Sequence, residues 1–284
     1  HPVSAPPYPR LGITCRTFNL EAINLSYILS LMAYKRFKYL NLSKTKKIRY
    51  FSNNSSSKIC VVFLHGFMSN IEGEKPSALA KFCLNKKINF LTLEYSGHGK
   101  SYGKFLKSNI SKWTRDVHRT INLKMKNKKL IIVGSSMGSW IAINIILKLK
   151  NKIKGFLGIS SAPEFLERLF WKKFSKKIKK IILSKKIYYV ENGGYSYPIT
   201  KQLIFDGKKN KVFNKKIKLK IPITLFHTIK DEVVPVSFSK KILRIFPYAK
   251  KKLIIIKNGN HSLSRKKDIK KICMELNKII KNCS

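Results

Sequence analysis

The chain has 284 residues, of which 44% are hydrophobic and 11% aromatic, so it carries enough apolar surface to form a core and is not a disordered chain. The net charge of +47 comes from 60 basic and 13 acidic residues, but only nine of the basic residues are arginine. Nucleic-acid readers favour arginine, and the lysines are spread along nearly every segment. We therefore interpret the charge as a solvated, lysine-coated surface and expect no specific nucleic-acid partner.

The amino-terminal segment differs in composition from the rest. Residues 1–31 carry only Arg10, Arg16 and Glu21 as charged side chains apart from His1. We expect Met32 to be the native start and residues 1–31 to be an upstream extension. The alternative is an ordinary N-terminal helix of the mature protein.

From about residue 46 onward, runs rich in β-formers alternate with helical patterns. Strands are predicted at 48–51, 58–64, 88–95, 129–133, 153–159, 221–227 and 251–256. Helices are predicted at 76–85, 111–125 (with Ser111 as N-cap), 137–149, 237–246 and 266–280. Such alternation is typical of an α/β fold in which helices cover both faces of a mostly parallel sheet. The alternation fails at about 162–218, where we expect a helical lid or cap inserted over the carboxyl ends of the strands.

A candidate nucleophile lies in the sequence Gly134-Ser-Ser136-Met-Gly138, directly after a predicted buried strand and before a predicted helix. A G-x-S-x-G sequence in this context is typical of a nucleophile elbow, because small residues on both sides let the backbone approach closely. Ser135 is the competing serine but lacks the symmetric glycines. The plain alternative is an ordinary Gly/Ser-rich turn.

A nucleophilic serine needs a base and an acid that orients the base. In chains with this elbow the order is Ser, Asp or Glu, then His. His261 follows the last predicted strand, and Asp231 follows the strand before it, whereas His227 ends a strand and is expected to be structural. We predict the triad Ser136, Asp231 and His261, with Glu232 as the alternative acid.

An oxyanion hole needs two backbone N–H groups that point at the reacting oxygen. The residue after the nucleophile, Met137, should supply one of them. The other should come from Phe67, in the loop after the strand that ends Val-Phe-Leu-His-Gly-Phe, where His65 is expected to brace the loop.

Five motifs together resemble those of α/β-hydrolases: residues 65–67, 95–101, 134–138, 230–235 and 259–261. Residues 67–75, 112–117 and 136–140 further resemble the mitochondrial palmitoyl-protein thioesterase of the abhydrolase-domain proteins and its bacterial relatives. The resemblance covers roughly 35–282. It implies hydrolysis of S-acyl thioesters and some acyl esters without a cofactor, on a small-molecule or protein-bound acyl substrate, with the triad at the three residues above. Ser139, Thr228 and Glu94 depart from the family pattern and leave the acyl specificity open.

The predicted insertion contains an aromatic and aliphatic series among lysines. Steps of three and four residues place Trp171, Phe174 and Ile178 on one helical face, and we expect Phe165, Trp171 and Phe174 to wall an acyl pocket. Two other interpretations are a basic amphipathic helix in weak contact with an anionic membrane, and a cap helix packed on the domain.

The function predicted from these observations is a serine hydrolase of acyl thioesters or carboxylic esters. The alternatives are a proline-type serine aminopeptidase of the same fold, and a basic nucleic-acid or membrane-surface binder on an inactive hydrolase scaffold. No metal site is expected, because the chain has no H-E-x-x-H sequence and its five cysteines have no zinc-module spacing. The cysteines are expected to be reduced thiols, which favours the cytoplasm.

Overall fold

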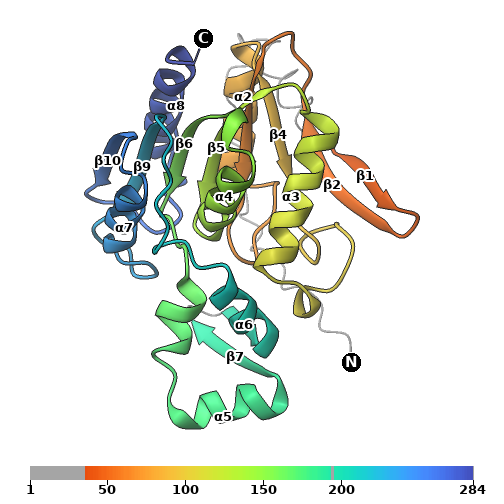
Figure 1. Cartoon of the computed structure of the whole chain (residues 1–284), viewed down its shortest axis with the longest axis vertical. Coiled ribbons are helices and arrows are strands. Elements are labelled where there is room, and N and C mark those ends of the chain that lie inside the picture. Colours follow the sequence, from red (N-terminus) through yellow and green to blue (C-terminus); the bar gives the residue numbers. More distant parts are fainter. Residues whose placement is uncertain (1–35, 193–194, 284) are drawn as a thin grey trace, which may run out of the picture.

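The computed structural model describes residues 36–192 and 195–283 (Figure 1). The expectations about residues 1–31 and Met32 concern a part of the chain outside these ranges. A central eight-stranded sheet has the order β1-β2-β4-β3-β5-β6-β9-β10. Its strands are β1 (Lys38–Ser43), β2 (Lys46–Ser52), β3 (Ile59–Leu64), β4 (Asn89–Leu93), β5 (Lys129–Ser135), β6 (Ile153–Ile159), β9 (Pro222–Thr228) and β10 (Lys250–Ile256).

Six of these strands, β3 to β6, β9 and β10, are parallel, whereas β2 pairs antiparallel with both β1 and β4. All six residues of β3 and all five of β4 are buried. The continuous apolar run of β3 is typical of a central parallel strand, because helices cover both of its faces. The expected α/β-hydrolase architecture, with a mostly parallel sheet, is confirmed.

The two faces of the sheet have separate cores. On one face α3 (Ile110–Lys124), α4 (Met137–Lys148) and α7 (Ser237–Ile245) pack against alternate strand residues such as Val62 and Ile132. On the other face α2 (Glu74–Asn85) and α8 (Lys266–Lys281) pack against the intervening residues such as Val61 and Ile131. Figure 1 shows the two helical layers in front of and behind the sheet. No helix within the described residues is long and apolar enough to cross a membrane.

Two local expectations differ from the structure. β1 was not predicted, because its sequence Lys-Tyr-Leu-Asn-Leu-Ser mixes polar and apolar residues and only Leu40 is buried. The assignment of Ser111 as the N-cap of α3 is wrong. The helix begins at Ile110, and the side chain of Asn109 accepts a hydrogen bond from the backbone N–H of Lys112 at 2.9 Å.

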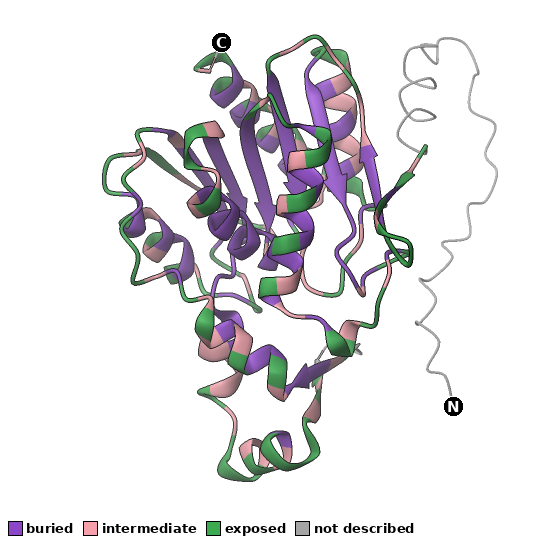
Figure 2. Ribbon diagram, turned by 45° about the vertical axis from the view of Figure 1, so that its right-hand side comes forward, coloured by how far each residue is buried: buried purple, intermediate pink, exposed green. Residues whose placement is uncertain are grey.

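Residues 160–221, between β6 and β9, form a segment that we call the insertion. It contains η3, a π-helical segment at Leu166–Trp171, then α5 (Lys176–Lys185), the antiparallel pair β7 (Ile187–Asn192) and β8 (Tyr195–Thr200), and α6 (Lys201–Lys209). The insertion extends away from the sheet, and α5 lies at its far end with most of its surface exposed (Figures 1 and 2). The described chain also contains two short 3₁₀ segments, η1 (Phe105–Lys107) and η2 (Lys150–Lys152).

The start and the end of the insertion contact each other, and the end also contacts α4. The buried carboxylate of Glu164 accepts hydrogen bonds from the backbone N–H groups of Val212 (2.8 Å) and Phe213 (2.7 Å). It also pairs with Arg168 at 2.9 Å. The indole N–H of Trp140, on α4, donates to the carbonyl of Asn210 at 2.8 Å. These contacts join the two ends of the insertion next to α4.

Candidate active site

The candidate site lies where the strand order changes direction. From the central strand β3 the chain adds β4 on one side and β5 on the other. The loops that leave the carboxyl ends of β3 and β5 therefore separate and form a crevice between them. Residues 65–67 follow β3, and Ser136 follows β5.

The backbone at Ser136 has the sharp turn that a nucleophile elbow requires. Ser136 has φ +52° and ψ −120°, a region that costs a residue other than glycine about 1–3 kcal/mol. A Cβ atom at Gly134 would lie 2.5 Å from the Cα of Ser139, and one at Gly138 would collide with the carbonyl oxygen of Leu64. The two glycines flanking the elbow are thus sterically required, as the sequence pattern predicts.

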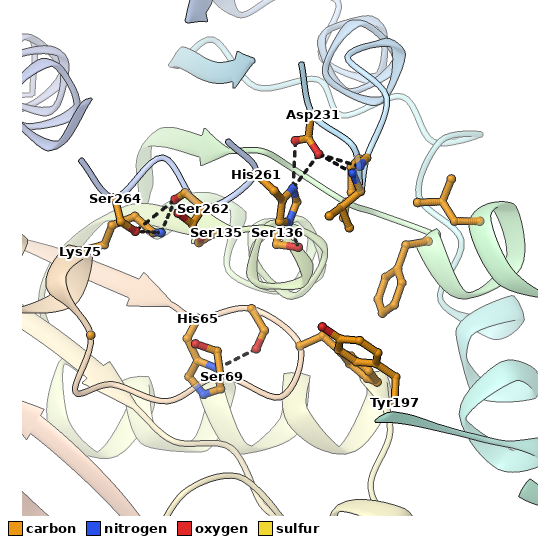
Figure 3. A pocket seen from close by; sticks show the side chains of 18 of the residues that line it. His65, Ser69, Lys75, Ser135, Ser136, Tyr197, Asp231, His261, Ser262 and Ser264 are labelled. Carbon is orange, nitrogen blue, oxygen red and sulfur yellow. Dashed lines mark hydrogen bonds and ion pairs between the residues drawn. The ribbon is translucent and has the colours of Figure 1, made fainter. Parts of the chain in front are cut away.

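Ser136, His261 and Asp231 lie in a hydrogen-bonded row, although they come from distant parts of the chain (Figure 3). His261 Nε2 lies 3.0 Å from Ser136 Oγ. His261 Nδ1 lies 3.0 and 2.9 Å from the two carboxylate oxygens of Asp231. With Nδ1 protonated and donating to Asp231, Nε2 is the acceptor for the serine hydroxyl, which is the tautomer that a general base needs.

The carboxylate of Asp231 is held as an anion inside the protein. Its side chain is only 1% exposed. Burial alone would raise its pKa, but hydrogen bonds from His227 and His261, and the backbone N–H of Val234 at 2.8 Å, hold the pKa well below the usual range of an aspartate. The backbone N–H of Val233 donates to the same oxygen at 3.0 Å. Asp231 therefore stays ionised and rigid at neutral pH.

The other candidates identified in the sequence occupy different surroundings. Ser135 is a buried residue at the end of β5, and its side chain makes none of the hydrogen bonds that tie Ser136 to His261. Glu232 is exposed at the edge of the same cavity.

Two backbone N–H groups are placed as the sequence analysis expects. Met137 is the first residue of α4, so its N–H has no partner within the helix, and it directly follows Ser136. Phe67 follows Gly66, at which an added Cβ would lie 3.5 Å from the Cβ of Ser136. Within the described residues, neither N–H is engaged in a hydrogen bond. Both groups are available to an oxygen held next to Ser136.

His65 holds the loop that carries Phe67. Its ring Nδ1 donates to the carbonyl of Gly66 at 2.9 Å, and the ring stacks on Tyr95, whose hydroxyl donates to the His65 carbonyl at 3.0 Å. Burial lowers the pKa of His65 to about 4, so the ring is neutral at neutral pH. This is the bracing role that the sequence analysis expects of His65.

A cavity of about 550 Å³ opens beside Ser136 and has two chemically different sides. One side is apolar and is built largely by the insertion: Ala162, Phe165, Leu169, Phe170, Val190 and Tyr197. The other side is polar and is built by the loop between β3 and α2, the start of α2 and the residues after His261: Ser69, Asn70, Glu74, Lys75, Ser262 and Ser264. Figure 3 shows Tyr197 and Lys75 on opposite sides of the Ser136–His261 pair. Within residues 36–192 and 195–283, no three potential ligands cluster as a metal site.

Of Phe165, Trp171 and Phe174, which are expected from the sequence to wall an acyl pocket, only Phe165 lines this cavity. The continuous helix that it assumed does not exist, because η3 ends at Trp171 and Ser175 caps a new helix by accepting from the N–H of Ile178 at 3.2 Å. This break turns the side chains of Trp171 and Phe174 away from the cavity. Trp171 packs on the Phe205 ring at 6.4 Å, and Phe174 stacks on Phe170 at 5.9 Å.

Five residues of the apolar side were not predicted from the sequence to line it: Ala162, Leu169, Phe170, Val190 and Tyr197. Val190 and Tyr197 are paired partners on β7 and β8. The signal for this hairpin is present, because Asn192-Gly193 stands between two runs rich in Tyr, Ile and Val. Nothing in the one-dimensional pattern, however, indicates which face of the hairpin meets Ser136.

Comparison with known proteins places the chain in a family. A family model described as serine aminopeptidase, S33, matches residues 55–196, which is half of the chain. The protein is therefore an α/β-hydrolase and belongs to this hydrolase family.

Among curated proteins, the chain resembles the mitochondrial palmitoyl-protein thioesterase ABHD10. It is 27% identical to the Bos taurus protein over 229 residues, which are 79% of this chain and 74% of that protein. The identity to the Homo sapiens protein is 25% with the same coverage.

Solved structures have the same fold. The mouse alpha/beta hydrolase domain-containing protein 10 superposes with a TM-score of 0.79 at 24% identity, over 87% of this chain and 99% of that one. Est1E from Butyrivibrio proteoclasticus, solved with bound ferulic acid, has a TM-score of 0.70 at 18% identity, over 86% and 97% of the two chains.

Proposed function

We propose that the protein is a serine hydrolase that cleaves acyl thioesters or carboxylic esters with a long apolar acyl chain. The observation that carries this proposal is the Ser136–His261–Asp231 row at the junction between an apolar and a polar side of one cavity. The named relatives are palmitoyl-protein thioesterases, which agrees with this substrate class.

Acylation begins at Ser136. His261 Nε2 takes the hydroxyl proton as Oγ attacks the carbonyl carbon of the substrate, and the carbonyl oxygen becomes an oxyanion. The N–H groups of Met137 and Phe67 stabilise that oxyanion, each contributing roughly 3–4 kcal/mol by analogy with measured donors. The protonated His261 then gives its proton to the leaving thiolate or alkoxide, and an acyl-serine remains.

Deacylation repeats the sequence with water as the nucleophile. His261 removes a proton from the water, the hydroxide attacks the acyl carbonyl, and the proton returns to Ser136 as the carboxylic acid departs. Asp231 holds the imidazole in the productive tautomer and stabilises the imidazolium in both steps.

We assign the two parts of the substrate to the two sides of the cavity. The apolar side, lined by Leu169, Phe170 and Val190, takes the acyl chain, because each buried methylene contributes about 0.8 kcal/mol. The polar side, near Lys75 and Ser264, takes the thiol or alcohol portion, which is the more polar half of an S-acyl peptide or acyl-carrier thioester.

A substrate panel tests this assignment. It should contain acyl thioesters and p-nitrophenyl esters of increasing chain length, together with an aminoacyl anilide for the aminopeptidase chemistry named in the family description. We expect kcat/KM to rise with acyl length and to remain small for the anilide. Preference for the anilide would favour a peptidase, and a Ser136→Ala variant with unchanged ester turnover would exclude a serine hydrolase.

A further inference from the structure

The outer surface of the insertion contains a strongly basic stretch of the chain. Residues 172–186 contain eight lysines and no acidic residue. Only Ile182 of α5 is fully buried, so the helix presents most of its circumference to solvent. Figure 2 shows this exposed helix at the end of the insertion, remote from the sheet.

The same surface also exposes apolar side chains. Lys176, Lys180 and Leu183 follow one another at helical spacing, so they share one face of α5, and Leu183 is 42% exposed. On the neighbouring elements, Tyr189 is 50% exposed and Phe205 is 41% exposed. A helix face that combines lysines with exposed apolar side chains is typical of segments that lie in a membrane interface.

Lysine–aromatic contacts make the surface continuous across three elements. Lys179 of α5 lies 5.9 Å from the ring of Trp171, at the end of η3. Lys208 of α6 lies 4.8 Å from the Trp171 ring and 5.3 Å from the Phe205 ring. We call this surface the basic-aromatic patch, which consists of Trp171, Lys176, Lys177, Lys179, Lys180, Leu183, Phe205 and Lys208.

We propose that the basic-aromatic patch docks the protein onto an anionic phospholipid bilayer. The patch is positive where such a bilayer is negative, and its exposed apolar side chains match the boundary between headgroups and acyl chains. A nucleic acid fits less well, because the single arginine of the insertion, Arg168, is already paired with Glu164.

The basic stretch that contains the patch also reaches the cavity. Lys173 is an exposed lysine of this stretch, and it lines the cavity beside Leu169 and Phe170. Docking through the patch would therefore bring the rim of the cavity close to the bilayer surface, where an acylated substrate is held. The binding itself does not depend on the proposed hydrolase activity.

Vesicle cosedimentation of the full-length protein tests the docking. The variant K176E/K177E/K180E changes the first, second and fifth positions of α5, and K266E/K267E/K270E changes the same positions of α8. Both remove the same net charge, but the lysines of α8 do not belong to the basic-aromatic patch, and α8 packs beside the sheet rather than in the insertion (Figure 1). With about 30% phosphatidylserine at about 0.1 M salt, we expect the α5 variant to lose at least about tenfold in partitioning relative to the α8 variant.

A second pair tests the apolar part. Leu183→Gln should weaken the part of the vesicle binding that remains at raised salt. Met274→Gln should not weaken it, although Met274 of α8 is also exposed, at 54%. Equal losses in the two triple variants would overturn the proposal and indicate general charge attraction. It would also be overturned if the α5 variant weakened binding of a single-stranded oligonucleotide more than binding of vesicles.

The activity readout separates this proposal from the proposed function. Ser136→Ala should bind the vesicles as the unaltered protein does, because Ser136 is not part of the patch. The α5 variant should hydrolyse a soluble short-chain ester normally and lose turnover only of a vesicle-embedded acyl substrate. Vesicle binding that is unaffected by the α5 changes overturns the docking proposal and leaves the hydrolase proposal standing.

Discussion

His227 contacts the same carboxylate oxygen of Asp231 that His261 contacts. Its Nε2 lies 3.2 Å from Asp231 Oδ2 and 2.9 Å from the carbonyl oxygen of Val234, while its Nδ1 lies 2.8 Å from the hydroxyl of Ser239. His227 is fully buried, so these contacts fix Nε2–H as the donor toward the acid. The sequence analysis treats His227 as structural, and the structure places it as a positioning residue for Asp231.

Replacement of His227 should therefore lower turnover without weakening substrate binding. A hydrogen bond to a charged group contributes about 1.5–3 kcal/mol, so His227→Leu should reduce kcat by roughly ten- to a hundredfold with little change in KM. His227→Gln, which retains an N–H donor, should recover part of the loss. Steady-state kinetics on folded protein check this, and an unchanged kcat in His227→Leu would show that Asp231 needs no second histidine.

The base of the insertion should be a stability determinant. Glu164→Ala leaves the buried N–H groups of Val212 and Phe213 without an acceptor, which should cost about 2–3 kcal/mol of unfolding free energy. Glu167→Ala is the control, because the Glu167 carboxylate is 3.8 Å from Lys208 and should matter less. Urea denaturation measures both variants, and equal midpoints would argue against this anchoring role of Glu164.

Lys75 should make the folded protein more stable as the pH rises above about 8. Its ammonium group contacts the carbonyl of Ser262 and the hydroxyl of Ser264 (2.9 Å), and burial lowers its pKa from 10.5 to about 8. Between pH 8 and 10.5 the unfolded chain therefore holds this proton more tightly than the folded protein does. The contribution of Lys75 to the free energy of unfolding should rise with pH across that window.

Comparison with Lys75→Met isolates this contribution from the other lysines. The difference in unfolding free energy between the unaltered protein and Lys75→Met should grow from pH 8 toward pH 10.5. Lys86→Met, which removes an exposed lysine just after α2, controls for the general effect of deleting one positive charge. A flat difference for Lys75 would mean that its pKa is not lowered.

Chain-length selectivity should depend on Phe170 rather than on Trp171. Phe170 lines the apolar side of the cavity, whereas Trp171, its neighbour in sequence, packs against Phe205. If Phe170→Ala removes the wall for about two methylenes, kcat/KM for long-chain thioesters should fall about tenfold, with acetyl esters little affected. Trp171→Ala should change all chain lengths alike. A long-chain defect confined to Trp171→Ala would restore the arrangement first expected from the sequence.

Much of the site could be predicted because its signals are local. The elbow at Ser136 depends on two glycines that a strained turn requires, and Asp231 and His261 follow predicted strands in the chain order of this fold. The lining of the cavity could not be predicted in this way. The periodicity of residues 171–181 looks continuous, but the cap at Ser175 breaks the helix, and the packing that turns Trp171 outward involves Phe205 and Lys208 from a distant element.

The role of Ser136 as the nucleophile is tested most directly by labelling with a fluorophosphonate probe, followed by mass spectrometry of the labelled peptide. Ser136 Oγ is within hydrogen-bond distance of His261, so we predict that the label is found on Ser136, persists in Ser135→Ala and disappears in Ser136→Ala. A label on Ser135, or undiminished labelling of Ser136→Ala, would contradict the assignment of Ser136 as the nucleophile.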